Sequence, residues 1–99
     1  MMDVDFSGSA VVVTGGAGGI GRAIAKACAA AGARVAVLDV KHEETASLLE
    51  ELPGEGHLCV TGDAGVEEDV RFFAEKVLEH FGRVDVLVNN ACICLLYTS

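Results

Sequence analysis

Apolar residues in this chain gather in four short runs, separated by segments of mixed polar and apolar character. The runs are "AVVVTG", "ARVAVLDV", "HLCVTGD" and "VDVLVNNA", at residues 10–15, 33–40, 57–63 and 84–91. A continuous apolar run that ends in glycine or an acid is typical of a strand buried on both faces. The pattern therefore predicts four strands of a parallel sheet.

The three segments between these runs repeat apolar residues at helical spacing, which predicts helices over residues 19–32, 42–52 and 66–82. The side chains that this spacing predicts to face the core are Ile20, Ala23, Ile24, Ala27 and Ala31 in the first helix, Leu48, Leu49 and Leu52 in the second, and Val66, Val70, Phe73, Val77 and Phe81 in the third. We expect Gly32, the Pro53-Gly54 pair and Gly82 to end the helices, because neither residue type continues a helix well.

Strands that alternate with helices predict an α/β fold with a parallel sheet and helices on both of its faces. Right-handed crossovers give the strand order 3-2-1-4, which is half of a doubly wound, Rossmann-like nucleotide-binding fold, truncated after the fourth strand. Ninety-nine residues make one domain at most. We place that half-domain at residues 1–93.

Composition and charge narrow the classes of partner. The net charge is −8, from 7 Lys and Arg against 15 Asp and Glu, which argues against binding nucleic acid or an anionic membrane. The longest apolar run is far shorter than the ~20 residues of a membrane helix. The N-terminus carries two acids and no basic residue, unlike a secretion signal, so we expect a cytoplasmic protein.

The four cysteines do not form a pattern typical of a metal site. Cys28 and Cys59 lie in apolar stretches, where we expect small core residues in a reducing compartment. Cys92 and Cys94 have no second Cys or His pair at zinc spacing, so no metal is expected.

The turn "TGGAGGIG", at residues 14–21, carries the clearest chemical signal. Glycines allow a tight turn and a close approach of phosphate, and the following helix offers unpaired N–H groups to a pyrophosphate. The glycines fit more than one dinucleotide-binding spacing, and a glycine-rich turn without a ligand is the alternative. The predicted cofactor-binding residues of this turn are Gly15, Gly16, Ala17, Gly18, Gly19, Ile20 and Gly21.

Two acids end the second and third strands. Asp39 follows Gly21 by eighteen residues, near the spacing of the acid that binds the adenosine ribose hydroxyls. A carboxylate there repels the 2′-phosphate of NADP, and Val40 rather than a basic residue follows it, so NAD is preferred over NADP. A solvated acid at a strand end is the alternative. Asp63 is placed to reach the adenine amino group; an acid at a strand end with no ligand is an equally open alternative. Gly65 is expected to cap the third helix.

Together, "TGGAGGIGRAIA", Asp39, Asp63 and "FGRVDVLVNNA" resemble the short-chain dehydrogenase/reductase family from Phe6 to about Ile93. The "NNA" motif resembles the shorter-subunit branch. The resemblance implies an NAD(P)-dependent oxidoreductase that transfers a hydride between NAD(H) and a small-molecule carbonyl or alcohol, in a homo-oligomeric parent protein.

The same resemblance implies roles for individual residues. It places the Ile20 N–H near the pyrophosphate and puts Asp63 and Ala64 in the adenine pocket. It gives Asn90 a contact to the cofactor or a tie between the central strands, with Asn89 as its structural neighbour.

The chain departs from the family pattern near its end. Cys92 stands where the family has glycine, and the Tyr-x-x-x-Lys pair with its serine, which carries the family's catalysis, does not occur. No catalytic residue is therefore predicted in this chain, which we expect to be inactive alone. The alternatives are a non-catalytic nucleotide-binding protein, such as a sensor or a degenerate paralogue, and a lone interaction domain.

The last six residues, "CLLYTS", do not continue the family pattern. One back-translation of residues 94–99 is TGT CTC TTA TAC ACA TCT, which matches the mosaic-end adapter of transposase-based sequencing libraries. We therefore expect this tail to be non-native and the reading frame to have left the gene at about Ile93; a natural apolar C-terminus is the alternative. A central strand left at an open edge would then make the 99-residue chain aggregate.

Overall fold

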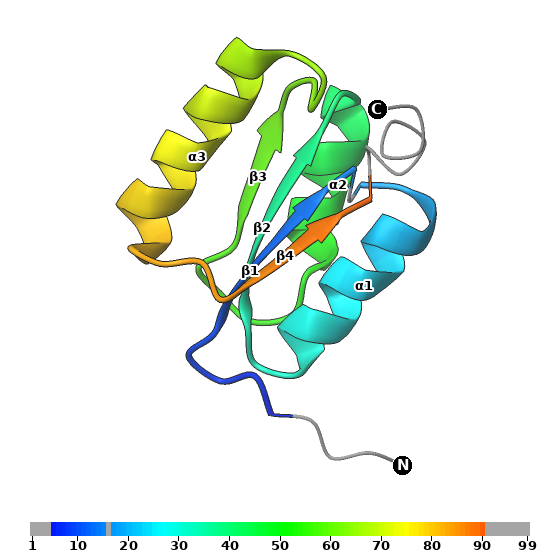
Figure 1. The fold of residues 1–99 in the computed structure, drawn as a ribbon. Helices are drawn as coiled ribbons and strands as arrows, with labels where there is room; N and C mark the ends of the chain where they lie inside the picture. Colours follow the sequence, from blue (N-terminus) through cyan, green and yellow to red (C-terminus); the bar gives the residue numbers. More distant parts are fainter. Residues whose placement is uncertain (1–4, 16, 91–99) are drawn as a thin grey trace.

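The structure is a computed structural model, and it describes residues 5–15 and 17–90. Strands and helices alternate along the chain, as the sequence predicts (Figure 1). The elements are β1 (Ala10–Thr14), α1 (Gly19–Ala30), β2 (Arg34–Asp39), α2 (His42–Glu51), β3 (Leu58–Thr61), α3 (Glu67–Phe81) and β4 (Val86–Asn89).

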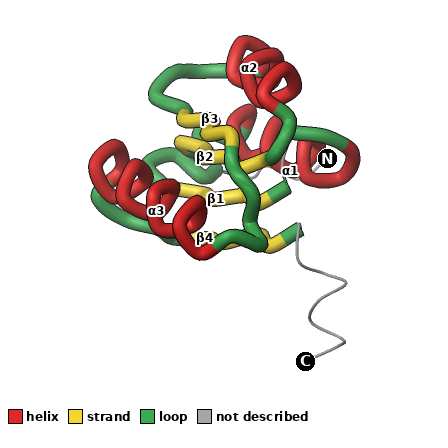
Figure 2. The backbone as a smooth tube through the Cα atoms, turned by 90° about the horizontal axis from the view of Figure 1, so that it is seen from above, coloured by secondary structure: helices red, strands yellow, loops and turns green. Residues whose placement is uncertain are grey.

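The four strands form one parallel sheet in the order β3-β2-β1-β4, which confirms the predicted topology. Val12 in β1 is level with Ala36 in β2 and with Leu87 in β4. Figure 2 shows the sheet with α1 and α2 on one face and α3 on the other. The chain order reverses at β1, so the carboxyl ends of β1 and β4 flank the position where a doubly wound sheet binds its ligand.

Alternate residues of the central strands supply two separate cores, one on each face of the sheet. The α1 and α2 face includes Val11, Val13, Val35, Val37, Ala25, Ala29, Leu48 and Leu52. The α3 face includes Ala10, Val12, Ala36, Leu38, Phe73, Val77 and Phe81. Cys28 and Cys59 pack against the first core, as expected, and burial raises the pKa of the Cys59 thiol to about 11.

The predicted buried face of α1 is wrong at most positions, although Ile24 is partly buried and packs against the first core. Ile20 is 72% exposed, Ala23 and Ala27 are exposed, and the buried positions are Gly21, Ala25 and Ala29. Alanines stand on both faces of this helix, so apolar spacing alone does not fix which face turns inward. Gly21 turns toward the sheet because a residue without a side chain allows the helix to pack closely against the strand.

Smaller corrections apply to the other two helices. In α2 Leu48 and Leu52 are buried as predicted, but Leu49 is exposed and Thr45 takes the inward position. In α3 Phe73, Val77 and Phe81 are buried as predicted, whereas Val66 and Val70 are exposed. Val66 directly precedes α3 and Val70 lies in its first turn, where the described part of the chain does not cover the helix.

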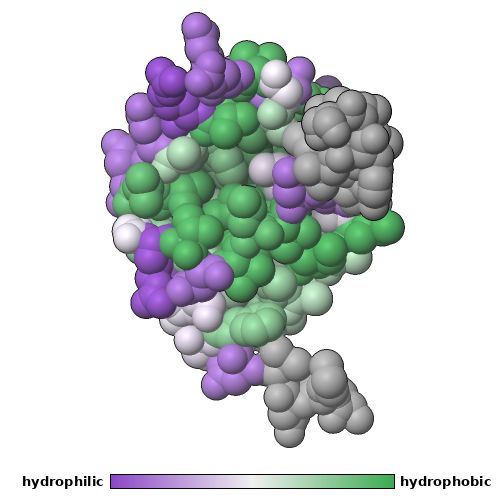
Figure 3. All heavy atoms as spheres, viewed as in Figure 1, coloured by the Kyte–Doolittle hydropathy of each residue, from purple (hydrophilic) through white to green (hydrophobic). Residues whose placement is uncertain are grey.

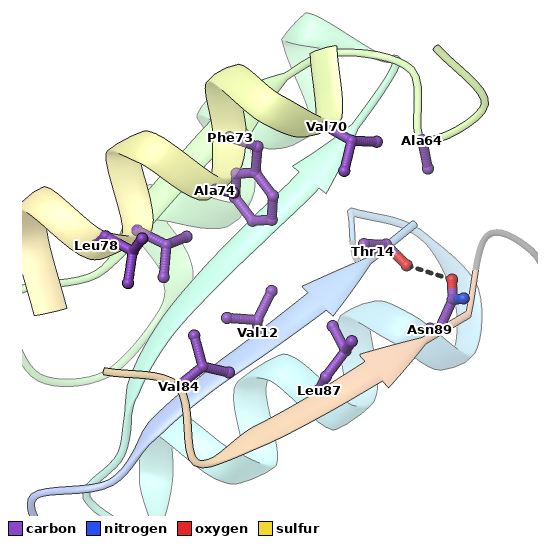
Figure 4. Close-up of a pocket in the computed structure, with 11 residues that line it drawn as sticks. Val12, Thr14, Ala64, Val70, Phe73, Ala74, Leu78, Val84, Leu87 and Asn89 are labelled. Carbon is purple, nitrogen blue, oxygen red and sulfur yellow. Dashed lines mark hydrogen bonds between the residues drawn. The ribbon is translucent and has the colours of Figure 1, made fainter. Parts of the chain in front are cut away.

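An apolar groove of about 380 Å³ runs between α3 and β4. Val84 and Leu87 approach it from the β4 side, and Phe73 and Leu78 approach it from α3 (Figure 4). Figure 3 shows the hydrophobic surface that gathers over this region. Within the described residues β4 pairs with β1 alone, and Leu87 is 63% exposed. The open apolar edge expected at the fourth strand is therefore present.

Among the described residues, no helix has the length and apolar character needed to cross a membrane.

Candidate cofactor-binding site

The glycine turn leaves β1 through Gly15, which has a φ of +69°. That left-handed conformation favours glycine, because a side chain there would be strained. The Gly15 N–H donates to the carbonyl oxygen of Leu38 at 2.7 Å, and its carbonyl accepts from Asn90 Nδ2 at 3.2 Å. Neighbouring strands on both sides therefore hold the start of the turn. Gly16, also predicted for this site, lies outside the described residues.

The start of α1 offers backbone N–H groups to an anion. Gly18 is the N-cap residue with extended φ, and no side chain caps the helix there. Gly19, Ile20 and Gly21 follow, and residues in a first helical turn have no carbonyl acceptor inside their own helix. Gly19 has a φ of +58°, and a Cβ added there would meet open space. Donors, helix dipole and free space together fit a phosphate group.

Asp39 lies beside this turn at the end of β2. Its Oδ2 accepts the Ala17 N–H at 3.1 Å, and its Oδ1 accepts the Lys41 N–H at 3.2 Å. A carboxylate has about four lone-pair positions, so two such contacts leave capacity for ligand hydroxyls. The structure thus brings the predicted ribose-binding acid to the glycine turn, through a contact to Ala17 that sequence reasoning did not predict.

The paired asparagines join the ends of the two central strands. The Asn90 N–H donates to the Thr14 carbonyl at 3.2 Å, and its side chain donates to Gly15. The Thr14 hydroxyl donates to Asn89 Oδ1 at 2.8 Å (Figure 4). Asn90 therefore makes the tie between central strands that was one of its two expected roles.

Asp63 organises the turn that leads into α3. Its Oδ1 accepts the Gly65 N–H at 2.8 Å, while its own N–H donates to Asp69 Oδ2 at 2.8 Å. Val66 rather than the predicted Gly65 is the N-cap residue, because the Asp63 side chain already closes the turn over Gly65. Ala64 lies at the end of the apolar groove, near Thr14 and Asn89 (Figure 4). No hydrogen bond within the described ranges joins Asp63 to the glycine turn.

Sequence reasoning missed the side chains that support the turn from α1 and α2. Arg22 Nη1 donates to the Ala17 carbonyl at 2.9 Å, and Arg22 also pairs with Glu51 in α2. The signal that was available is the basic residue directly after Gly21 in "GIGR". Its partner stands 29 positions later, so only the packing of the two helices reveals the pair.

Among the described residues, the N–H groups at the start of α1 and the Asp39 carboxylate have the chemistry needed to hold a nucleotide, and no constellation for acid–base catalysis is brought together. In the part of the chain that the structure describes, no group of three or more potential metal ligands occurs. Tyr97, Cys92 and the suspected tail at 94–99 lie outside the described residues, so the expectations about them remain predictions.

A doubly wound sheet with a glycine turn at its switch point defines a nucleotide-binding half of Rossmann type. The sequence profile of the short chain dehydrogenase family matches residues 9–98, so the chain belongs to that family. It is 39% identical over 89 residues to zerumbone synthase of Zingiber zerumbet, covering 89% of this chain and 33% of that protein. It is 40% identical over 102 residues to D-threitol dehydrogenase of Mycolicibacterium smegmatis, covering 96% and 38%.

The fold is also similar to that of solved structures. A crystal structure of 3-ketoacyl-(acyl-carrier-protein) reductase from Brucella melitensis, complexed with NADH, aligns with a TM-score of 0.79 at 32% identity. The alignment covers 84% of this chain and 34% of the reductase. The chain therefore spans about a third of the length of the proteins that it matches.

Proposed function

We propose that this chain is the NAD-binding N-terminal part of a short-chain oxidoreductase. The complete protein would transfer a hydride between NAD(H) and a carbonyl or alcohol carbon of a small molecule. The observation that carries the proposal is the juxtaposition of Asp39 with the glycine turn, which puts a hydroxyl-binding carboxylate beside a set of anion-binding N–H groups. The NADH bound to the Brucella reductase supports the choice of ligand class.

Different residues would bind different parts of the cofactor. The N–H groups of Gly19, Ile20 and Gly21 would hold the pyrophosphate at the start of α1. Asp39 would accept hydrogen bonds from the adenosine ribose, and Asp63 with Ala64 would border the adenine. Asn90 would keep the turn open by holding the Gly15 carbonyl away from the phosphates. When bound, the nicotinamide would supply the hydride chemistry.

A preference for NAD over NADP follows from the acids around the ribose position. Asp39 would face a 2′-phosphate at close range, with a repulsion of roughly 1–4 kcal/mol in partly wet surroundings. The Glu44 carboxylate adds to this repulsion, because its Oε2 lies 3.3 Å from the position that a Cβ on Gly18 would take. Lys41, whose Nζ is 3.8 Å from Glu44 Oε1, offsets part of that charge.

Catalysis would come from residues beyond this sequence, in the manner of the shorter-subunit branch that "NNA" resembles. The same resemblance supports a homo-oligomeric parent, and the sequence features support a cytoplasmic location. Reading the parent gene past the codon for Ile93 tests this part of the proposal. A downstream serine with Tyr-x-x-x-Lys supports an oxidoreductase, whereas a gene that ends after "CLLYTS" would contradict it and favour a non-catalytic nucleotide-binding protein.

A further inference from the structure

The turn between β1 and α1 is supported by a side-chain network that the cofactor contacts proposed above leave unused. Arg22, in the first turn of α1, donates from Nη1 to the Ala17 carbonyl across 2.9 Å. Its Nη2 donates to the Glu51 carboxylate at the end of α2. A single guanidinium thus connects the turn to a second helix.

Ala17 is held at both of its backbone groups by charged side chains. Its N–H donates to Asp39, its carbonyl accepts from Arg22, and the residue is only 1% exposed. On one side of it, Gly15 at φ +69° is held through its N–H by Leu38 and through its carbonyl by Asn90; on the other, Gly19 has a φ of +58° at the start of α1. Ala17 therefore fixes the turn between Gly15 and the start of α1.

We propose that Arg22 is a positioning residue for the cofactor pyrophosphate, and that Glu51 is its anchor. The proposal rests on the proposed NAD-binding function. Without the Arg22 contact, the peptide group between Ala17 and Gly18 can rotate. The turn then samples conformations that do not present the N–H groups of α1 to a phosphate. Binding has to select the competent conformation, and apparent affinity falls by the fraction of molecules that hold it.

The shape of the side chain matters here as much as its charge. A planar guanidinium can donate to a carbonyl and a carboxylate at the same time, whereas an ammonium group concentrates its charge at one point. Glu51 also neutralises Arg22, and it accepts from Ser47 Oγ at 3.1 Å. Arg22 acts on the pyrophosphate through the turn, because both of its terminal nitrogens are engaged with protein oxygens.

Lys26 provides a matched control. It lies one turn further along α1 and donates to the same carboxylate, with Nζ 3.3 Å from Glu51 Oε1. No hydrogen bond among the described residues connects Lys26 to the glycine turn. Removing Lys26 therefore removes a positive charge and a Glu51 partner but leaves Ala17 held.

The test uses the full-length parent protein and calorimetric titration with NAD and ADP-ribose, with adenosine measured by displacement of NAD. Arg22→Met and Arg22→Lys should each weaken the binding of NAD and of ADP-ribose about tenfold, which is the effect of losing one charged hydrogen bond. Lys26→Met should change them by less than about twofold. Adenosine, which lacks the pyrophosphate, should bind all variants alike. Glu51→Gln, which leaves Arg22 in place, should give a smaller loss with the same ligand pattern and serves if Arg22→Met does not fold.

Three results would overturn the positioning role. Arg22→Lys binding as the unaltered protein does would mean that charge alone matters. Equal losses of affinity for adenosine and ADP-ribose would indicate a general structural role. Unchanged NAD affinity in Arg22→Met and Glu51→Gln would mean that the contact does not affect binding. Absence of NAD binding by the unaltered protein would instead contradict the proposed function, so the two failures are distinguishable.

Discussion

The Ala17 N–H donates to the Asp39 carboxylate across 3.1 Å, and this hydrogen bond joins the glycine turn to the end of β2. The acid expected to select the cofactor therefore also shapes the loop expected to bind its phosphates. Substitution of Asp39 has two effects that must be separated, one on charge and one on the turn.

Asp39→Asn keeps an acceptor for the Ala17 N–H and removes the charge. Because repulsion of a 2′-phosphate disappears, we expect the NADP-to-NAD ratio of dissociation constants to fall at least about fivefold. Asp39→Ala with Val40→Arg should go further toward NADP, while losing affinity for both cofactors through the turn. Calorimetric titration of the full-length protein measures both ratios, with Glu50→Gln on α2 as the control. Unchanged affinities for both cofactors would refute the assignment of Asp39.

His57 completes the hydrogen bonding at the start of β2. Its Nδ1 accepts the Val35 N–H at 3.1 Å and its Nε2 donates to the Pro53 carbonyl at 2.7 Å, which requires the neutral ring with the proton on Nε2. His57→Phe leaves the N–H of a buried residue unpaired, so we expect the free energy of unfolding to fall by about 1–3 kcal/mol. Urea unfolding of the full-length protein checks this, with the exposed His80→Gln as control. Equal stability of His57→Phe and the unaltered protein would show that water replaces the ring.

Asp85 ties the start of β4 to the start of β1. Its Oδ1 accepts from Arg83 Nη2 at 2.6 Å and its Oδ2 accepts the Ala10 N–H at 2.8 Å. The Arg83 hydrogen bond, followed by the Ala10 N–H, lowers the pKa of the Asp85 carboxyl below its usual value. A lowered folded-state pKa stabilises the fold above about pH 4 and loses that stabilisation as the pH falls through the folded pKa.

Asp85→Asn should therefore destabilise the full-length protein at neutral pH and flatten the decline of its stability at acid pH. Urea unfolding at a series of pH values between about 2 and 6 measures both effects. Glu79→Gln, on the exposed side of α3, is the control. A variant whose stability runs parallel to that of the unaltered protein across this range would contradict the linkage to Asp85.

The groove between α3 and β4 predicts how the 99-residue chain behaves by itself. Within the described residues β4 pairs with β1 alone, and Val84 and Leu87 are exposed, which favours association between copies. We expect the isolated chain to be aggregated or molten, and Leu87→Lys to reduce aggregation in sedimentation velocity. Val40→Lys changes a site of similar exposure (56% against 63% for Leu87) that does not line the groove, and it should have little effect. A soluble monomer with a sharp two-state melt would overturn this expectation.

The sequence was sufficient to predict the fold and to propose candidate site residues, because these signals are strong and local. Continuous apolar runs specify buried parallel strands, and the crossover rule then leaves one strand order. Asp39 was proposed as a site residue from its distance to Gly21. These features depend on spacing along the chain, and the observed strand order confirms the topology.

What the sequence did not reveal depends on how the elements pack. The buried face of α1 was mispredicted because alanines occupy both of its faces, so Gly21 and the turn before it decide the orientation. The Arg22–Glu51 pair joins two helices that only the finished sheet brings together. Hydrogen bonds such as the one from Ala17 to Asp39 likewise require the loop and the strand end to be placed first.

The most direct test of the central claim is calorimetric titration of the full-length parent protein with NAD and NADP under identical conditions. We expect saturable binding of NAD, weaker binding of NADP, and loss of NAD binding in Gly19→Val, which strains a residue at φ +58° at the start of α1. Saturable NAD binding that survives Gly19→Val, or no binding of either cofactor by the unaltered protein, would contradict it.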